Sequence, residues 1–207
     1  MIALLSKIEK TTLAIFFPKY GHFLNVPPMS VGAHFDSAIF EPVSPLKIFL
    51  ALRKLKSLAF RGGFSKIVAY DIGSGTGFLI RILLLFRFER AVGIEYNRKL
   101  AERSQVNLKK FIDKGICTIH CDDATKFRIP DGDSIVFLFN PFGRNSIESF
   151  FRRNRDYFSS NRCYVVYIND LYVHEIPNNF LVLFQNSLLK FSILVNQNID
   201  NYKKVLD

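Results

Sequence analysis

The sequence predicts an α/β fold in which a doubly wound, mostly parallel sheet of seven strands carries helices on both faces. Short runs of β-branched and aromatic residues alternate along the chain with longer segments of helical spacing. The short runs are apolar throughout, as expected of parallel strands that are buried on both faces. A turn with three glycines in five positions joins the first run to the helix that follows it. These three observations together favour the α/β class.

Length and composition predict one domain preceded by a short extension. A chain of 207 residues is the size of a single domain, and a hydrophobic content of 49% with 22 phenylalanines can fill a large core. We assign residues 1–35 to the extension and 36–207 to the domain. The extension is apolar, but its charged residues leave runs much shorter than the roughly 20 residues that span a bilayer. It predicts an amphipathic helix over part of the core, with contact to a membrane surface as the alternative.

Net charge and cysteine content limit which binding partners and metals are expected. The net charge of +10 favours association with anionic molecules. The basic residues are scattered, so we interpret them as a solvated surface and treat nucleic acid as an alternative partner that the sequence does not favour. The three cysteines lack Cys-x-x-Cys spacing, which indicates reduced thiols, and no metal site is expected. No targeting signal is recognised, and we expect a cytoplasmic protein.

The first half of the domain contains four predicted elements. They are a helix over 44–60, a strand over 66–72, a helix over 77–86 and a strand over 90–96. The first helix has Ser44 as its N-cap and Pro45 at its first helical position, where a missing N–H costs nothing. Gly62 and Gly63 mark its exit.

The second half continues the alternation. Its predicted elements are a helix over 97–115, a weak strand over 117–121, a strand over 133–140, a helix over 146–158 and a strand over 162–170. Asn97 is the expected N-cap of the first of these helices, and Gly115 is its expected stop. The apolar tail over 180–195 is ambiguous, because its pattern fits a helix followed by a closing pair of strands.

The glycine-rich turn, DIGSGTG, predicts a site for a nucleotide-like ligand. Gly73 and Gly75 can adopt backbone angles that are closed to other residues and leave space for a ligand, while Gly77 allows the helix to pack closely on the sheet. Dinucleotide-binding turns have their third glycine one position later, where this chain has Phe78. No Gly-Lys-Ser/Thr follows, which excludes a P-loop, and NAD is disfavoured.

Three acidic positions narrow the choice of ligand. Asp71, two residues before the first glycine, would repel a pyrophosphate and favour a cationic molecule such as S-adenosylmethionine, which has an ammonium and a sulfonium group and no phosphate. Glu95 ends a predicted strand, where a carboxylate can accept hydrogen bonds from both hydroxyls of a ribose. Asp122 and Asp123 follow the weak strand, within reach of an adenine if strand order places them beside the site. Each acid alone also fits a helix cap or a turn.

From about residue 36 to 170 the sequence resembles the class I S-adenosylmethionine-dependent methyltransferases. DIGSGTG matches the cofactor loop of that family, VGIEYN its ribose-binding strand and DDATKF its adenine loop. The resemblance extends to a small bacterial-type group through FEPVSP, at 40–45, and FLFNPFG, at 137–143. It implies a Rossmann-like methyltransferase sheet and S-adenosylmethionine as the cofactor.

The resemblance also implies the residues of a cofactor site. They are Asp71, Gly73, Ser74, Gly75, Gly77, Glu95, Tyr96, Asp123, Ala124 and Asn140. By this resemblance Asp71 neighbours the amino group of the methionine part and Glu95 binds the ribose. Asp123 faces the adenine and is preferred to Asp122, because it directly precedes Ala124.

The tripeptide Asn140-Pro141-Phe142 supplies the candidate catalytic residues. It resembles the Asp/Asn-Pro-Pro-Tyr/Phe box of amino-group methyltransferases, in which the amide and a following carbonyl accept hydrogen bonds from the target nitrogen. Those bonds would aim the nitrogen lone pair at the methyl carbon, and an aromatic face would stabilise the developing charge. Only one proline is present here. The alternative interpretation is an ordinary turn that ends a strand.

These patterns predict a methyltransferase that modifies an amino nitrogen of a protein side chain, with lysine as one candidate, or of a small molecule. A cofactor-binding protein without catalysis and an RNA-associated protein are the alternatives. Asn169 and Asp170, at the end of the last predicted strand of the alternation, are candidates for the substrate pocket. The identity of the acceptor and the oligomeric state are left open by the sequence.

Overall fold

The structure, a computed structural model, describes residues 44–139 and 143–197. The predicted extension, and the candidate catalytic residues at 140–142, lie outside the described residues. In chain order the elements are α3 (Pro45–Ala59), β1 (Val68–Ile72), α4 (Phe78–Leu85), β2 (Arg90–Glu95), α5 (Arg98–Ile112), β3 (Cys117–Cys121), β4 (Ser134–Phe139), α6 (Arg144–Arg153), α7 (Arg155–Ser160), β5 (Cys163–Ile168), a 3-10 turn η1 (Val173–Glu175), β6 (Phe180–Asn186) and β7 (Phe191–Asn196). None of the helices in these described ranges is long and apolar enough to cross a membrane.

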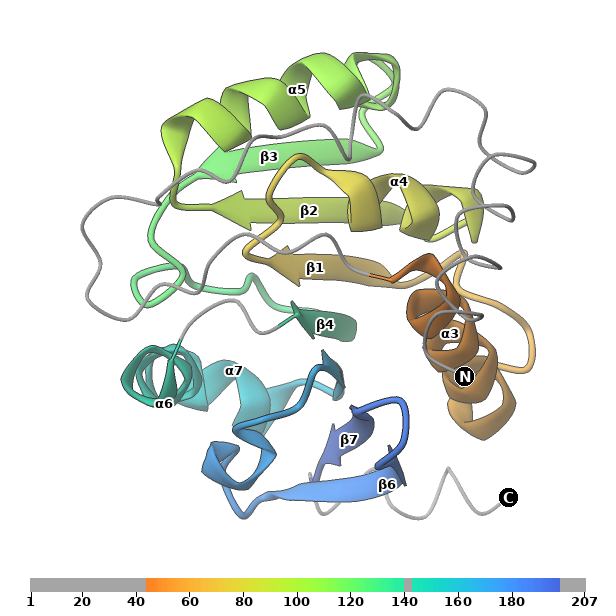
Figure 1. Cartoon of the computed structure of the whole chain (residues 1–207), viewed down its shortest axis with the longest axis vertical. Helices are drawn as coiled ribbons and strands as arrows, with labels where there is room; N and C mark the ends of the chain where they lie inside the picture. The colour runs from red at the N-terminus through yellow and green to blue at the C-terminus, as the bar shows by residue number, and fades with distance from the viewer. Residues whose placement is uncertain (1–43, 140–142, 198–207) are drawn as a thin grey trace.

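The seven strands form one mixed sheet in the order β3-β2-β1-β4-β5-β7-β6 (Figure 1). Strands β1 to β5 pair in parallel, whereas β7 is antiparallel to both of its neighbours, β5 and β6. The predicted α/β sheet is therefore present, with one strand reversed. Because parallel strands end at the same edge, the loops that follow β1 to β5 meet along one side of the molecule, where the arrowheads point in Figure 1.

The ambiguous tail forms two strands and no helix. β6 and β7 are joined by a short turn in which Asn186 Oδ1 accepts a hydrogen bond from the Leu189 backbone N–H at 2.9 Å, and Lys190 has a φ of 53°. Of the elements that the ambiguous pattern allowed, the closing pair of strands is present and the helix before it is not. A continuous apolar run does not distinguish a helix from a strand, and pairing of β7 with the buried strand β5 decides the outcome.

The predicted helix over 146–158 is divided into α6 and α7 at Asn154. This side chain is 2% exposed, and its amide bonds both to the loop after β3 and, from Nδ2 at 3.0 Å, to the Phe150 carbonyl of α6. Its Oδ1 accepts a hydrogen bond from the Ile129 N–H at 2.8 Å, and its Nδ2 donates to the Phe127 carbonyl at 3.1 Å. The expectation of one continuous helix is wrong, because a partner far along the sequence binds the amide at this position.

The predicted helix caps are confirmed. Ser44 Oγ accepts a hydrogen bond from the Lys47 N–H at 3.3 Å, and Pro45 opens α3. Asn97 Oδ1 accepts hydrogen bonds from the backbone N–H groups of Lys99 and Leu100, at 3.0 and 3.3 Å, and so caps the start of α5. Gly115 has a φ of 71° and follows the end of α5, where a glycine stop was expected. These ends are local features, which explains why the sequence predicts them.

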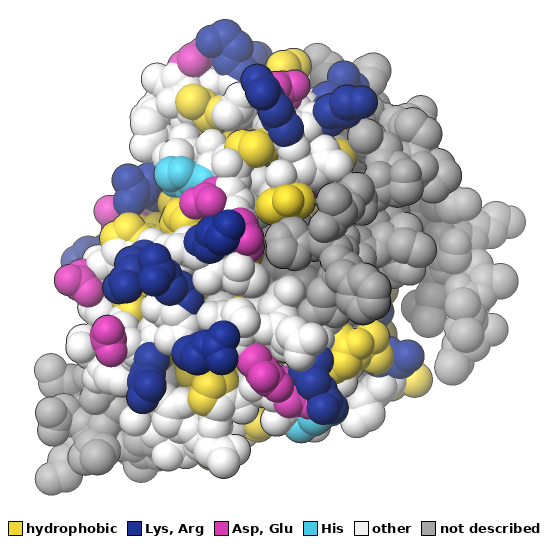
Figure 2. Space-filling model, turned by 90° about the vertical axis from the view of Figure 1, so that its left-hand side faces the viewer, with side chains coloured by type: hydrophobic (Ala, Val, Ile, Leu, Met, Phe, Trp, Pro, Cys, Tyr) yellow, Lys and Arg dark blue, Asp and Glu magenta, His cyan; other side chains and the backbone are white. Residues whose placement is uncertain are grey.

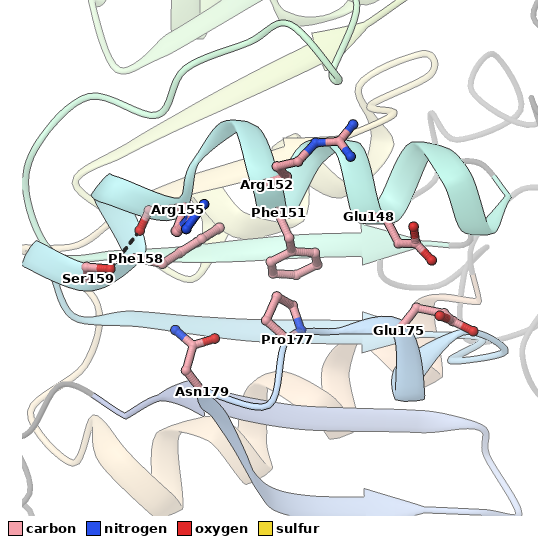
Figure 3. Close-up of a pocket in the computed structure, with 9 residues that line it drawn as sticks. All are labelled: Glu148, Phe151, Arg152, Arg155, Phe158, Ser159, Glu175, Pro177 and Asn179. Carbon is pink, nitrogen blue, oxygen red and sulfur yellow. Dashed lines mark hydrogen bonds between the residues drawn. The ribbon is translucent and has the colours of Figure 1, made fainter.

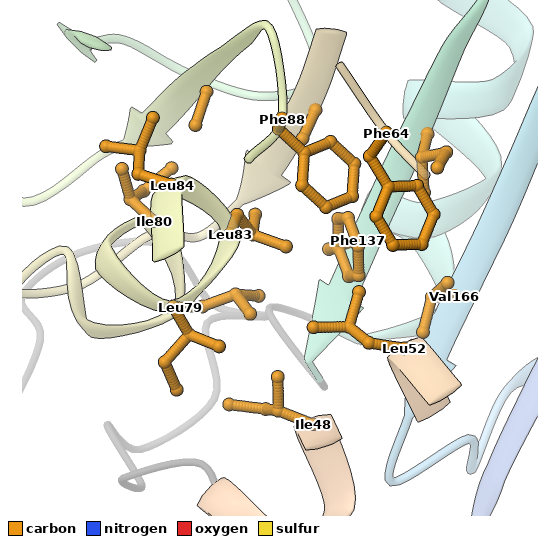
Figure 4. Close-up of a cluster of buried hydrophobic side chains, with 14 of the residues drawn as sticks. Ile48, Leu52, Phe64, Leu79, Ile80, Leu83, Leu84, Phe88, Phe137 and Val166 are labelled. Carbon is orange, nitrogen blue, oxygen red and sulfur yellow. The ribbon is translucent and has the colours of Figure 1, made fainter. Parts of the chain in front are cut away.

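Two hydrophobic layers hold the helices on the two faces of the sheet. One layer joins α3, α4 and α5 to one face and is drawn in Figure 4. At its centre the Phe64 and Phe88 rings stack with centroids 4.4 Å apart, and Phe137 of β4 meets Phe88 edge-on at 6.2 Å. The other layer joins α6 and α7 to the opposite face. Alternate residues of β1 and β4 enter each layer, which confirms that helices cover both faces.

Candidate functional site

The glycine-rich turn folds onto the end of β2. The backbone N–H groups of Gly73 and Ser74 donate to the Ile94 carbonyl at 2.8 and 3.0 Å. Gly73 and Gly75 have φ values of 79° and 54°, the left-handed conformation that favours glycine. The turn is therefore held against β2 by its backbone, and its glycines are required by its geometry.

Glu95 links the ends of neighbouring loops through its carboxylate. Its Oε2 accepts a hydrogen bond from the Gly75 N–H at 2.7 Å, and its Oε1 accepts from the Asn97 N–H at 2.7 Å. Its backbone carbonyl accepts from the Asp122 N–H at 3.0 Å, which joins the loop after β3. Burial raises the pKa of Glu95, and these backbone hydrogen bonds oppose that rise. Each carboxylate oxygen keeps a lone pair for a further donor.

Asp71 lies in β1, beside the Glu95 carboxylate. Its side chain is 2% exposed, and among the described residues no Lys or Arg forms a salt bridge with it. Burial, and then the negative charge of Glu95, raise the pKa of Asp71 to about 8. A buried carboxyl group of this kind favours a cation at the site, because a cation would offset the cost of ionising it.

Gly77 allows the turn to approach helix α5. A Cβ atom at this position would lie 2.4 Å from Ser104 Oγ and 2.6 Å from a methyl carbon of Leu108. The close contact is therefore with a neighbouring helix, whereas the sequence suggested a contact with the sheet. Asn107, on the same helix, donates from Nδ2 to the Thr76 carbonyl at 3.0 Å. These α5 residues were not predicted, because no local signal in the sequence connects them with a turn about thirty residues earlier.

The side chain of Ser74 is turned away from the sheet edge. Its Oγ lies 2.7 Å from the position that a Cβ of Gly93 would take, so it packs over β2. Tyr96, by contrast, is 46% exposed directly after the end of β2. Of these two residues from the predicted cofactor set, only Tyr96 presents its side chain at the surface.

The two acids after β3 stabilise their own loop. Asp123 Oδ1 accepts hydrogen bonds from the N–H and the hydroxyl of Thr125, at 2.9 and 2.7 Å, and Oδ2 lies 3.6 Å from Lys126 Nζ. Asp122 is exposed, and its Oδ1 accepts from the Asp123 N–H at 2.7 Å. Ala124 is buried under the loop. Asp123 therefore stabilises a turn, which was the alternative role for this residue, and its contact with adenine stays a prediction.

The end of β5 is linked to the start of α3. Lys47 Nζ donates to Asn169 Oδ1 at 2.9 Å, and Asn169 has a φ of 53°. Asp170 Oδ2 accepts hydrogen bonds from the Ser192 hydroxyl and, at 3.4 Å, from Gln185 Nε2. These two residues thus have structural partners in α3, β6 and β7. β4, which leads to the Asn-Pro-Phe tripeptide, pairs with β1, so the tripeptide follows a strand that neighbours the glycine turn.

A groove of about 370 Å³ lies elsewhere, between the helices α6 and α7 and the segment before β6 (Figure 3). Its carboxylates, Glu148 and Glu175, lie toward one end, and Arg155 lies toward the other. The residues that line it are Glu148, Phe151, Arg152, Arg155, Phe158, Ser159, Glu175, Pro177 and Asn179. None of these residues belongs to the predicted cofactor set.

Comparison with known protein families and with curated protein sequences finds no match. Comparison with solved structures finds methyltransferase folds. A protein provisionally described as an RNA methyltransferase, from Pyrococcus horikoshii, has a TM-score of 0.59 at 18% identity, over 92% of this chain and 97% of its own. A protein provisionally described as a methyltransferase, from Escherichia coli, has a TM-score of 0.56 at 18% identity, over 72% of this chain and 86% of its own.

A third similar structure is a protein from Haemophilus influenzae that is provisionally described as a methylase. It has a TM-score of 0.53 at 18% identity and covers 72% of this chain and 98% of its own length. At these identities the likeness concerns the fold. The mixed seven-stranded sheet, with its glycine turn after β1, has the Rossmann-like fold of class I methyltransferases.

Proposed function

We propose that this protein is an S-adenosylmethionine-dependent methyltransferase that transfers a methyl group to an amino nitrogen. The observation that carries the proposal is the joined end of β1 and β2, where Glu95 binds the Gly75 N–H beside the buried carboxyl of Asp71, with which no described lysine or arginine forms a salt bridge. A pyrophosphate placed there would face two carboxyl groups, whereas a cationic ligand would be stabilised by them.

The chain's own residues fit this cofactor at two points. Asp71 is a buried acceptor, free of a lysine or arginine partner among the described residues, for an ammonium group. Glu95 is held by two backbone N–H groups, with lone pairs left for ribose hydroxyls. When bound, the cofactor would supply a methyl group activated by a sulfonium. Glu95 and Asp71 would orient it, and the glycine turn would allow its close approach.

For the transfer, we assign to Asn140 the role of positioning the substrate amine. Its amide oxygen would accept a hydrogen bond from that amine. That bond would direct the nitrogen lone pair, and the nitrogen would form its new bond to carbon as the carbon–sulfur bond breaks and its electron pair goes to sulfur. The proton left on the product amine would pass to water. A protein side chain, lysine included, and a small molecule are the acceptors that the sequence suggests.

Calorimetric titration with S-adenosylmethionine and with NAD tests the cofactor. We expect heat of binding with S-adenosylmethionine only, and its loss in Glu95→Ala, which removes the carboxylate that holds the turn. Glu102→Ala is the control, because Glu102 is exposed on α5 and pairs only with Arg98 four residues earlier in the described structure. A protein that binds NAD and ignores S-adenosylmethionine would overturn the proposal.

Asn140→Ala extends this test to the transfer step. The variant should bind S-adenosylmethionine as the wild type does, and methyl transfer should fall by at least about a hundredfold once an acceptor is in hand. Undiminished transfer would remove Asn140 from the mechanism. A protein that binds the cofactor but methylates no acceptor would instead support the alternative of a cofactor-binding protein without catalysis.

A further inference from the structure

Two basic segments that are far apart in the sequence meet through the side chain of Asn154. The amide of Asn154 binds the backbone of residues 127 and 129, and Arg153 Nε donates to the Lys126 carbonyl at 3.2 Å. These bonds bring the loop that carries Lys126 and Arg128 against the junction of α6 and α7. We define the basic surface as Lys126 and Arg128 of this loop, Arg153 beside them, and Arg152 and Arg155 on the adjoining turns, where these two also line the groove with Glu148 and Glu175.

Among the described residues no carboxylate forms a salt bridge with the four arginines of this surface, although Glu148 and Glu175 line the groove beside Arg152 and Arg155. All five side chains belong to exposed residues. Arg152 Nη2 donates to the Ser149 hydroxyl at 3.2 Å, and Arg153 Nε donates to the Lys126 backbone carbonyl. Lys126 Nζ lies 3.6 Å from Asp123 Oδ2. Figure 2 looks onto the sheet edge and shows Lys and Arg side chains down this side, with acidic ones between them.

We propose that the basic surface binds the phosphodiester backbone of a nucleic acid, and that the amino nitrogen to be methylated belongs to that nucleic acid. Arginine presents planar donors that pair with two phosphate oxygens at once, and four of the five cations are arginines. The proposal rests on the proposed function for the methylation itself. It replaces the protein side chain or small molecule, which the sequence suggested, with a polymer that carries regular negative charge.

The position of the surface fits an acceptor of this size. The basic loop continues directly from Asp123 and Ala124, and α6 begins at Arg144, two residues after the candidate catalytic tripeptide ends. A helix of this length is about 15 Å long, and each strand of a DNA duplex carries a charge about every 3.4 Å along the axis, so α6 matches the length of about four nucleotides of such a strand. One strand could therefore contact the basic surface and reach the sheet edge.

A membrane surface fits this side less well. Peripheral membrane binding needs apolar side chains that enter the lipid beside the cations. The large apolar side chains that are well exposed in the described ranges lie elsewhere, at Phe49, Leu85, Tyr96, Val106, Leu171, Val182 and Leu188. The basic surface contains none of them, which favours a polyanion in solution.

The test compares two variants with the same change of charge. Arg128→Gln/Arg152→Gln/Arg155→Gln alters the basic surface and spares Arg153, whose contact joins the two segments. Lys109→Gln/Lys110→Gln/Lys114→Gln alters the exposed end of α5 and the turn that follows it. Binding of fluorescent 20-nucleotide RNA and DNA, and of polyglutamate, is measured by anisotropy from about 50 to 200 mM salt, a range over which phosphate contacts weaken strongly.

We expect the wild type to bind RNA or DNA with an affinity that falls steeply as salt rises. The basic-surface variant should bind at least about tenfold more weakly, and the slope of log affinity against log salt should fall by about two, as for three lost contacts to a single strand. The α5 variant should bind within about twofold of the wild type. A difference between the RNA and DNA arms would identify the natural polymer.

Three results would overturn the inference: no binding of either nucleic acid, equal losses in the two variants, or equally tight binding of polyglutamate. Equal losses would show that net charge alone attracts the polymer. Titration of the same variants with S-adenosylmethionine separates this inference from the proposed function. A wild type that binds the cofactor but no nucleic acid refutes the surface alone, and one that binds nucleic acid but no cofactor refutes the proposed function alone.

Discussion

Ionisation of the Asp71 carboxyl lowers the free energy of unfolding of the ligand-free protein, by an amount that depends on pH. Burial and the charge of Glu95 raise its pKa to about 8, whereas an aspartate in an unfolded chain titrates near 3.9. Between these values the native state binds more protons than the unfolded state, so the free energy of unfolding falls as pH rises. The fall is at most about 1.4 kcal/mol for each pH unit. A cationic ligand would offset the cost of ionising this buried carboxyl group.

Asp71→Asn should remove this dependence, because an amide of the same shape does not titrate. We expect the variant to be more stable than the wild type above about pH 5, with a difference that grows up to about pH 8. Urea unfolding at one-unit pH intervals measures it. Asp156→Asn, at an exposed position on α7, is the control and should stay within about 0.5 kcal/mol of the wild type. A constant difference for Asp71→Asn would contradict the assigned titration.

At the scale of elements, Gly77 brings the glycine turn into close contact with α5. Gly77 and Gly115 both have positive φ, 82° and 71°, but only Gly77 has side chains against the position of a Cβ atom. Within 4 Å of a Cβ on Gly115 there is nothing. The two glycines therefore separate the cost of backbone conformation from the cost of displacing α5.

Gly77→Ala should be the more harmful of the two substitutions. Both alanines carry about 1–2 kcal/mol for the left-handed conformation. Gly77→Ala must also move Ser104 and Leu108, and we expect at least about 1 kcal/mol of further destabilisation. It should also weaken binding of S-adenosylmethionine, because α5 supports the turn, whereas Gly115→Ala should not. Chemical denaturation and calorimetry measure both effects, and equal effects of the two substitutions would exclude a role for the contact.

At the scale of the whole molecule, the candidate site joins loops from separate strands of one sheet. A ligand that binds only the folded protein stabilises it by about 2.7 kcal/mol at a hundred times its Kd. For a chain of this length that free energy corresponds to a rise in Tm of about 5–10 °C. We therefore expect S-adenosylmethionine to raise the Tm in a thermal melt and NAD to leave it unchanged. Equal shifts with both ligands would argue against selective binding of the cationic cofactor.

The sequence by itself determined the types and order of most elements, the helix caps and the glycine turn. These features depend on neighbours in the chain: an N-cap such as Asn97 binds N–H groups two and three residues away, and a glycine turn needs only its own backbone angles. The acids at strand ends were visible for the same reason. The continuous apolar runs identified strands, but they did not separate strand from helix in the tail.

Only the tertiary structure decided which of these features meet. Strand order brings Gly75 to Glu95 across 20 residues, and it places Asp71 where burial and a second carboxyl raise its pKa. The break at Asn154 and the basic surface follow from bonds to a loop 25 and 27 residues away. Such contacts are selected by the packing of the whole sheet and its helices, because each buried polar group takes a partner from whichever segment the fold brings beside it. Local sequence patterns do not contain that information.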